Sequence, residues 1–329
     1  MNTSTARCRL LAAVSMMLVM LALPVAPIAQ PYPAKPIRLI NPFAAGGTGE
    51  ILFRLLEPTL EARLGQKIVL EGRTGAGGNI GAEAVANAPA DGYTLLIGAT
   101  NMFVVNQFLF PKMTFDPLKV LAPITIIADV PSVFYVHPSL PARNLQDLIA
   151  YARANPGKLN YASPGTGTTP HLNVELLSQF AGINMVHVPY KGLQPAMAAV
   201  IANEVQLYLA GLGAGLGHLK AGKLRAIAVG SRERMPGIPD VPTVIESGFK
   251  DFVASNWFAF AAPAGTDAQI LERWAAETRH ALAQPEVQRR LGDLGIVAVG
   301  NSPAQFAAAL RREAQQWQQV IVRGGIKLQ

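Results

Sequence analysis

Strand-like and helix-like patterns alternate along almost the whole chain. Short apolar runs typical of buried strands, at 37–43, 67–70 and 93–98, are followed by segments in which apolar residues recur at helical spacing. The first helical segment follows residue 50. Gly65 is expected to end this helix, and Pro58 is expected to kink it. This alternation predicts an α/β fold with largely parallel sheets.

Two longer apolar, strand-like runs, at 130–137 and 255–263, bracket a segment that contains its own strand and helix units. Without its first residues the chain has about 300, more than a single core usually holds. We therefore predict two α/β domains joined by two crossover strands, with a ligand cleft between them. The first domain is discontinuous, residues 30–131 plus 259–329, and the second spans 132–258.

Three strand-like runs end at loops rich in Gly and Thr, at 44–50, 75–79 and 163–169, and each loop leads into a helical segment. Such loops expose backbone N–H groups at a helix N-terminus, where the helix dipole favours an anion. Together they predict a site for a negatively charged ligand. The simpler alternative is that the glycines only make tight turns.

The same loops could in principle bind a nucleotide. The dinucleotide fingerprint G-x-G-x-x-G fails, because Ile80 stands where a third glycine should follow Gly75 and Gly77. No Gly-Lys-Ser/Thr of a phosphate-binding loop occurs anywhere in the chain. A nucleotide site is therefore disfavoured.

The N-terminus is typical of a secretory signal peptide, predicted here as residues 1–29. Arg7 and Arg9 precede an apolar run over 10–23, and small residues follow near Ala26 and Ala29, the two candidate cleavage points. An uncleaved membrane anchor is the alternative, although the run is shorter than the roughly 20 residues of a spanning helix. The only cysteine, Cys8, would leave with the signal, so the exported chain has no thiol for disulfides or catalysis.

Composition and motifs argue against several function classes. Half of the residues are hydrophobic, and the net charge of +7 is spread along the chain without the basic, aromatic-interleaved stripe of a nucleic-acid binder. The five histidines lie far apart along the chain and form no metal-binding pair, so no metal and no cofactor are expected. No G-x-S-x-G elbow is present, and Ser163 with His171 would be half a catalytic triad without a nameable acid. We therefore expect a binding protein, not an enzyme.

Many short runs, in order, resemble one family, the periplasmic solute-binding proteins of tripartite tricarboxylate transporters, known as Bug or TctC-like proteins. The runs that carry this resemblance are Tyr32–Arg38, Pro42–Gly47, Gly75–Ala82, Asp91–Leu95, Leu159–Ser163, His187–Gly192, Lys220–Arg225 and Asp240–Val244. The resemblance covers essentially all of the chain after the signal peptide.

The resemblance implies a type II periplasmic-binding-protein fold that closes on a carboxylate-bearing solute and delivers it to a membrane permease. In this family the loops hold the ligand's carboxylates chiefly by backbone N–H and hydroxyl groups. The residues that this implies for ligand binding are Phe43, Gly46, Gly47, Thr48, Gly77, Gly78, Asn79, Thr100, Asn101, Ser163, Gly165, Thr166, Gly167, Thr168, Thr169, Tyr190, Ala210 and Gly211. The protein is expected to be periplasmic and monomeric. A ligand sensor for a membrane receptor or sensor kinase, and an exported enzyme, are the alternatives.

Departures from the family pattern bear on specificity. Many members have Phe-Asp-Asn where this chain has Leu209, Ala210 and Gly211, and Asp where it has Glu50. Without the acidic and amide pair a substrate ammonium group loses its partner, which favours a simple carboxylate or an aromatic acid over an amino acid. The glycine-rich stretch 213–217 that follows is expected to lower helix stability by about 1 kcal/mol per glycine and to loosen that wall.

Overall fold

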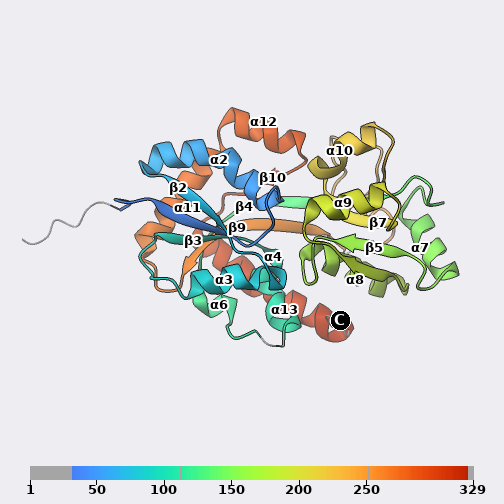
Figure 1. Ribbon diagram of the computed structural model, residues 1–329, viewed down its shortest axis with the longest axis horizontal. Helices are drawn as coiled ribbons and strands as arrows, with labels where there is room; N and C mark the ends of the chain where they lie inside the picture. The colour runs from blue at the N-terminus through green and yellow to red at the C-terminus, as the bar shows by residue number, and fades with distance from the viewer. Residues whose placement is uncertain (1–31, 112, 251, 325–329) are drawn as a thin grey trace, which may run out of the picture. The chain divides into compact units, whose positions relative to one another are not determined.

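The computed structural model describes residues 32–111, 113–250 and 252–324, and the predicted signal peptide, 1–29, lies outside this range. Ten strands are joined through one long strand, β4 (Leu121–Val136). Its first part belongs to sheet A, in the order β2-β1-β3-β9-β4, and its last residues to sheet B, in the order β4-β7-β5-β6. The interleaved helices confirm the predicted α/β class (Figure 1).

Sheet A contains the first and last parts of the described chain. Its strands are β1 (Ile37–Asn41), β2 (Ile68–Gly72), β3 (Thr94–Ala99) and β9 (Ser255–Pro263), with the short β10 (Val297–Ala298) beside β4. The strand β1 is parallel to β2 and β3, whereas β9 is antiparallel to β3 and β4.

Sheet B is formed by the middle of the chain. It contains β5 (Asn160–Ser163), β6 (Val186–Pro189) and β7 (Leu207–Gly211), with β8 (Arg225–Val229) paired to β4. The strand β5 is parallel to both β6 and β7. The partner of β4 changes between Pro131, which pairs with Ser255, and Ser132, which pairs with Gly211. The predicted division into two domains remains a prediction.

Helices cover both sheets (Figure 1). Those that follow or pack on sheet A are α2 (Thr48–Leu64), α3 (Asn79–Ala86), α4 (Thr100–Val104), α5 (Asn106–Leu109), α6 (Pro117–Val120), α11 (Ala268–Leu282), α12 (Pro285–Asp293) and α13 (Pro303–Gly324), with a 3-10 turn η1 (Ala76–Gly78). Those of sheet B are α7 (Leu145–Ala154), α8 (Thr169–Ala181), α9 (Leu193–Ile201) and α10 (Leu212–Lys220). Among the described residues, no helix is both long and apolar enough to cross a membrane.

Several predicted element bounds shift in the structure. The helix α2 runs through Pro58 as one element and ends, as predicted, at Gly65, whose φ of 69° lets its N–H reach the Glu61 carbonyl. The strand β4 begins nine residues before the predicted run at 130, because its first part pairs with β9. The helix α3 begins at Asn79, directly after the η1 turn.

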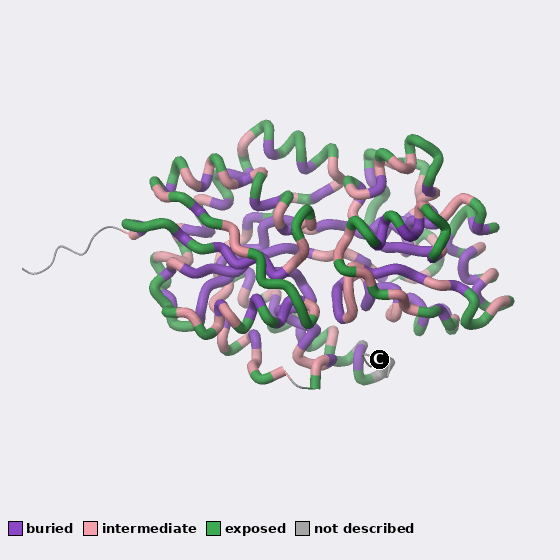
Figure 2. Tube along the Cα trace, viewed as in Figure 1, coloured by how far each residue is buried: buried purple, intermediate pink, exposed green. Residues whose placement is uncertain are grey.

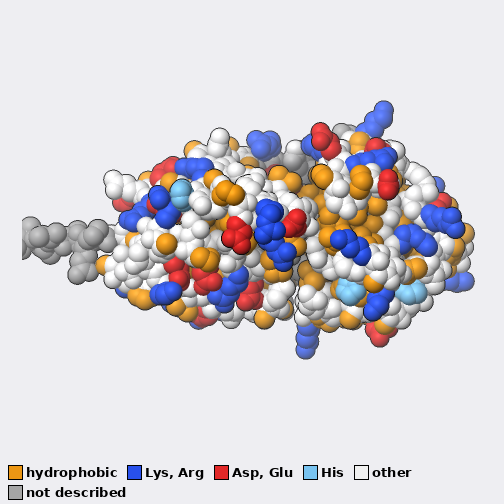
Figure 3. Space-filling view, turned by 90° about the horizontal axis from the view of Figure 1, so that it is seen from above, with side chains coloured by type: hydrophobic (Ala, Val, Ile, Leu, Met, Phe, Trp, Pro, Cys, Tyr) orange, Lys and Arg blue, Asp and Glu red, His pale blue; other side chains and the backbone are white. Residues whose placement is uncertain are grey.

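Alternating side chains of β4 fill two cores on the two faces of sheet B. Phe134 and Val136 pack into a cluster with residues of α7 and α8, while Val133 and Tyr135 pack into one with residues of α9 and α10. Figure 2 shows the buried residues concentrated along the strands and the exposed ones on the outer helix faces. The strand ends that face the loops are thereby fixed in place. Figure 3 shows side chains of both charges scattered over one face of the molecule.

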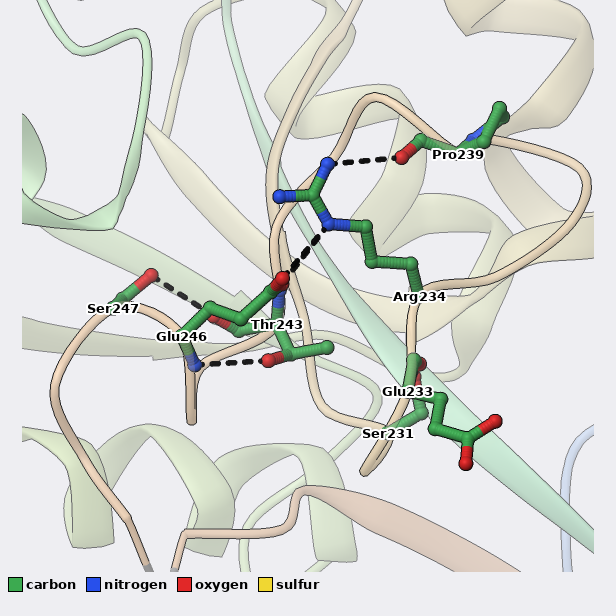
Figure 4. Close-up of polar contacts among 7 residues, drawn as sticks. All are labelled: Ser231, Glu233, Arg234, Pro239, Thr243, Glu246 and Ser247. Carbon is green, nitrogen blue, oxygen red and sulfur yellow. Dashed lines mark hydrogen bonds and ion pairs between the residues drawn. The ribbon is translucent and has the colours of Figure 1, made fainter.

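The long connection from β8 to β9 is held by one arginine (Figure 4). Arg234 donates to both carboxylate oxygens of Glu246, at 3.0 and 3.1 Å, and to the Pro239 carbonyl. Glu246 also accepts the N–H of Thr243, and the Thr243 hydroxyl accepts the N–H of Glu246. This reciprocal capping orders a segment with little regular structure.

Candidate functional site

A cavity of about 450 Å³ lies at the strand ends where the three Gly/Thr loops meet. Its wall combines the β1–α2 loop, the η1 turn, the β5–α8 loop, the β6–α9 turn, the ends of β7 and β9, and the part of β4 where the strand passes from sheet A to sheet B. The residues that line it are Pro42, Phe43, Ala44, Gly47, Thr48, Thr74, Gly75, Ala76, Gly77, Gly78, Asn101, Phe110, Val130, Ser132, Pro164, Gly165, Thr166, Thr168, Thr169, Pro170, Lys191, Gly192, Leu193, Tyr208, Ala210, Gly211, Asn256 and Phe258.

The structure brings most of the predicted site residues to this cavity and leaves others outside its lining. At the cavity lie Phe43, Gly47, Thr48, Gly77, Gly78, Asn101, Gly165, Thr166, Thr168, Thr169, Ala210 and Gly211. Outside the lining lie Gly46, Asn79, Thr100, Ser163, Gly167 and Tyr190. That the lining residues bind a ligand remains a prediction.

In the first loop, most of the backbone donors proposed for a ligand are already used. The N–H of Gly46 donates to Glu50 Oε2 at 2.9 Å, and that of Gly47 donates to the Ala44 carbonyl at 3.1 Å. The N–H of Phe43 donates to Asn41 Oδ1 at 3.3 Å. This loop therefore offers a ligand fewer free N–H groups than its glycines suggest.

The second loop is held by buried amide side chains. Asn101 and Asn106 both donate to the Gly77 carbonyl, at 2.6 and 3.2 Å, and Asn106 also donates to Asn79 Oδ1 at 2.6 Å. Thr100 accepts the N–H of Trp257 at 3.0 Å and so joins α4 to β9. Asn79 and Thr100 thus support the fold beside the cavity. No local sequence signal distinguishes this role from ligand binding.

The third loop is supported from behind by a histidine pair. Ser163 Oγ and His187 Nε2 lie 2.7 Å apart, and the N–H of Gly167 donates to His171 Nδ1 at 3.1 Å. The rings of His171 and His187 stack with centroids 3.9 Å apart. These two histidines are distant in the sequence but meet in the fold, because β6 runs beside β5 and α8 follows β5.

Both imidazoles are held in their neutral form. Burial lowers the pKa of His171 to about 3, with His187 contributing, and burial lowers the pKa of His187 to about 4. Ser163 is fully buried, and its hydroxyl pairs with His187 rather than with His171. Within the described residues no three metal-ligating side chains gather in one place.

Two polar side-chain atoms at the cavity are buried without a partner among the described residues, Thr169 Oγ1 and Asn256 Oδ1. Thr169 is 1% exposed and lines the cavity, and its Oγ1 has no hydrogen-bond partner in the described structure. It is the first residue of α8, whose first turn has no acidic residue and no side-chain cap. An unpartnered buried hydroxyl is costly, and the open helix N-terminus beside it favours an anion.

A cation that sequence reasoning missed stands beside this helix end. Lys191 lines the cavity, whereas its neighbour Tyr190, a predicted site residue, is partly buried and packs against the cluster that contains residues of α9 and α10. The N–H of Gly192 donates to the Pro164 carbonyl at 3.2 Å, which places the β6–α9 turn against the third loop. No local sequence signal distinguishes Lys191 from Tyr190, because both lie after the end of β6 in the turn that leads to α9.

The end of β7, where the sequence departs from the family pattern, forms part of the cavity wall. Ala210 and Gly211 line the cavity beside Val130 and Ser132 of β4, and Gly211 pairs with Ser132. A Cβ on Gly211 would lie 2.6 Å from Val130 Cγ1, so a larger residue at 211 would press on the Val130 side chain. No acidic side chain is among the described residues that line the cavity.

Comparison with known proteins identifies the family. Residues 52–326 match the model of the tripartite tricarboxylate transporter family receptor, TctC. The protein BugT of Bordetella pertussis is 36% identical over 321 residues, which cover 97% of this chain and 98% of BugT.

Two solved structures share the fold over most of this chain and all of their own. The R. palustris protein Rpa4515 with adipate is 34% identical, with a TM-score of 0.85 and 90% of this chain covered. The periplasmic binding protein BugD is 32% identical, with a TM-score of 0.84 and 90% covered. The predicted type II periplasmic-binding-protein fold is thereby confirmed. The chain belongs to the tripartite tricarboxylate transporter receptor family, and it is a periplasmic solute-binding protein of the Bug type.

Proposed function

We propose that this receptor captures a small carboxylate-bearing solute in the cavity and delivers it to a tripartite tricarboxylate-type membrane permease. The observation that carries the proposal is the buried, unpartnered Thr169 hydroxyl at the open N-terminus of α8. A carboxylate there would accept hydrogen bonds from the hydroxyl and from first-turn N–H groups. The related Rpa4515 structure contains adipate, a carboxylate, which supports this ligand class.

The same arrangement favours binding over chemistry. Ser163 is buried behind the loop, and both histidines beside it are neutral and support the loop. We therefore propose that the protein is not an enzyme, acts in the periplasm after export, and works as a monomer. Light scattering of the purified protein tests the monomeric state.

Isothermal titration calorimetry with a panel of carboxylates tests the binding proposal. The variant Thr169→Val removes the hydroxyl at nearly constant volume and should weaken carboxylate binding by about 10- to 100-fold, because a hydrogen bond to a charged group is lost. The matched control Thr114→Val, at an exposed threonine outside the cavity lining, should bind like the unchanged protein. Binding of no anionic metabolite, or equal binding by Thr169→Val, would contradict the proposal.

Delivery to the permease needs a separate measurement. Uptake of the bound carboxylate by cells should fall when the gene for this receptor is deleted and should recover with the intact gene. It should not recover with the Thr169→Val gene at low solute concentration. Unchanged uptake in the deletion strain would favour the sensor alternative.

A further inference from the structure

The two sides of the cavity differ in chemistry. On the sheet A side, Phe43 from the first loop, Phe110 after α5 and Phe258 from β9 line the wall. Phe43 and Phe258 meet edge to face, with ring centroids 5.8 Å apart and planes at 70°. Aromatic faces of this kind stabilise flat apolar groups.

The helix N-terminus on the sheet A side already has its own anion. Glu50 lies in the first turn of α2, and its carboxylate accepts the N–H of Gly46 at 2.9 Å. This carboxylate satisfies a loop donor and offsets the positive end of the helix dipole. Glu50 is also 3.7 Å from Arg54 Nε and does not line the cavity, but its charge makes this helix end less favourable for a second anion than an uncapped one.

The helix N-terminus on the sheet B side, that of α8, has no anion of its own. The first turn of α8 has no acidic residue, the Thr169 hydroxyl is buried without a partner, and Lys191 stands at the adjoining turn. Among the described lining residues, Lys191 is the only one with a charged side chain. One carboxylate therefore finds its partners here, and neither a second carboxylate nor an ammonium group has a counter-charge elsewhere in the wall.

We propose that the ligand is a monocarboxylate with a flat, ring-sized apolar body and no amine. Its carboxylate lies at Thr169 and Lys191, and its ring lies against Phe43, Phe110 and Phe258. This inference rests on the proposed function and narrows its substrate class. A cavity of about 450 Å³ with apolar walls and a few polar groups fits a ligand of this size.

Calorimetry with matched pairs of acids tests the inference on the full exported chain. Benzoate should bind at least about 10-fold more tightly than terephthalate, which adds only a second carboxylate. For the same reason, 3-phenylpropanoate should bind at least about 10-fold more tightly than phenylalanine, which adds an ammonium group. Benzoate should also bind more tightly than hexanoate, which lacks the ring.

Two variants test the assigned roles. Phe43→Leu should bring benzoate and hexanoate affinities closer together, whereas Phe180→Leu, at a ring 58% exposed and outside the cavity lining, should leave their ratio unchanged. Glu50→Gln keeps an acceptor for Gly46 but removes the charge, so it should raise terephthalate affinity relative to benzoate.

The outcomes separate this inference from the proposed function. Tighter binding of terephthalate, phenylalanine or hexanoate than of their partners would overturn the substrate class while leaving a carboxylate receptor intact. If the ratio of terephthalate affinity to benzoate affinity is unchanged in Glu50→Gln, the role assigned to Glu50 is overturned. Binding of none of these acids, nor of any aliphatic carboxylate, would instead remove the proposed function itself.

Discussion

The Ser163 hydroxyl and the Nε2 atom of His187 lie 2.7 Å apart directly behind the third Gly/Thr loop. Ser163 also accepts the N–H of Gly165, and His171, stacked on His187, accepts the N–H of Gly167. Two neutral imidazoles thus order the loop that precedes α8. These contacts fix the loop, and they also occupy the N–H groups of Gly165 and Gly167.

This arrangement predicts acid sensitivity. The pKa of His171 is lowered to about 3 and that of His187 to about 4, mainly by burial. As the pH falls, the unfolded chain therefore binds protons at these residues at a higher pH than the folded protein does. Stability should therefore fall as the pH drops from about 6.5 toward 3. The variant His171→Asn, which keeps an acceptor for Gly167, should flatten this dependence in urea titrations at a series of pH values. His280→Asn, at an exposed position of α11, is the control and should leave the slope unchanged.

The glycines of α10 provide a second prediction, because they differ in their surroundings. A Cβ on Gly215 would lie 2.4 Å from ring atoms of Tyr135, which is fully buried and whose hydroxyl donates to the Leu212 carbonyl. A Cβ on Gly217 would meet nothing within 4 Å. Gly215→Ala should destabilise the protein by about 1–3 kcal/mol through overpacking. Gly217→Ala should stabilise it by about 0.5–1 kcal/mol through helix propensity.

Thermal or chemical denaturation of the two variants measures this difference. A stabilising effect at both positions would show that the α10 glycines only weaken the helix, as their composition alone suggested. The structure instead indicates that Gly213 and Gly215 allow close packing, since a Cβ on Gly213 would lie 2.4 Å from Leu294 Cδ2.

The alternation of elements and most of the loops that line the cavity could be predicted from the sequence, because both depend on local patterns. Apolar periodicity marks the strands and helices, and Gly/Thr runs between them mark helix N-termini. The use of individual loop donors could not be predicted in this way. Whether the N–H of Gly46 faces a ligand or Glu50 depends on one side-chain conformation.

Contacts between residues that are distant in the sequence explain the other differences between the predicted and the observed site. His171 and His187 meet because β5 and β6 are parallel neighbours, and Asn79 is bound by Asn106 from a helix that lies beyond β3. The four residues of a Pro-Tyr-Lys-Gly turn do not reveal which side chain faces the cavity, and the structure selects Lys191 over Tyr190. These are tertiary relationships that periodicity does not encode.

Lys191 predicts how binding responds to salt. Its exposed side chain lines the cavity beside the α8 N-terminus, so it should attract a carboxylate without being essential for it. Lys191→Gln should weaken binding by about 2- to 5-fold at low salt, as expected of an exposed ion pair, and by less at 1 M salt. Calorimetry at several ionic strengths measures this, with Lys158→Gln, exposed and outside the cavity lining, as the control. An equal loss at all salt concentrations would contradict the electrostatic role.

Glu313 of α13 predicts that stability changes with pH in the direction opposite to that expected from the two histidines. Burial raises the pKa of the Glu313 carboxyl, and the nearby Asp129, whose own pKa is raised by burial, adds to this effect. The Trp257 indole N–H donates to Glu313 Oε2 at 2.8 Å, which is a bond that glutamine can also accept. Because the folded protein holds this proton more tightly than the unfolded chain does, the stabilisation is present below pH 4.5 and is lost as the pH rises.

Glu313→Gln should therefore be more stable than the unchanged protein at pH 8 and about equally stable at pH 4, because glutamine carries no charge to desolvate at either pH. Urea denaturation at the two pH values measures the difference. The control Glu272→Gln, at an exposed position of α11, should change stability little at either pH. Lower stability of Glu313→Gln at pH 8 would mean that the carboxylate contributes favourably as an anion, through Trp257 or through the neighbouring Arg312, which lowers the Glu313 pKa. Burial would then not be the dominant effect at this residue.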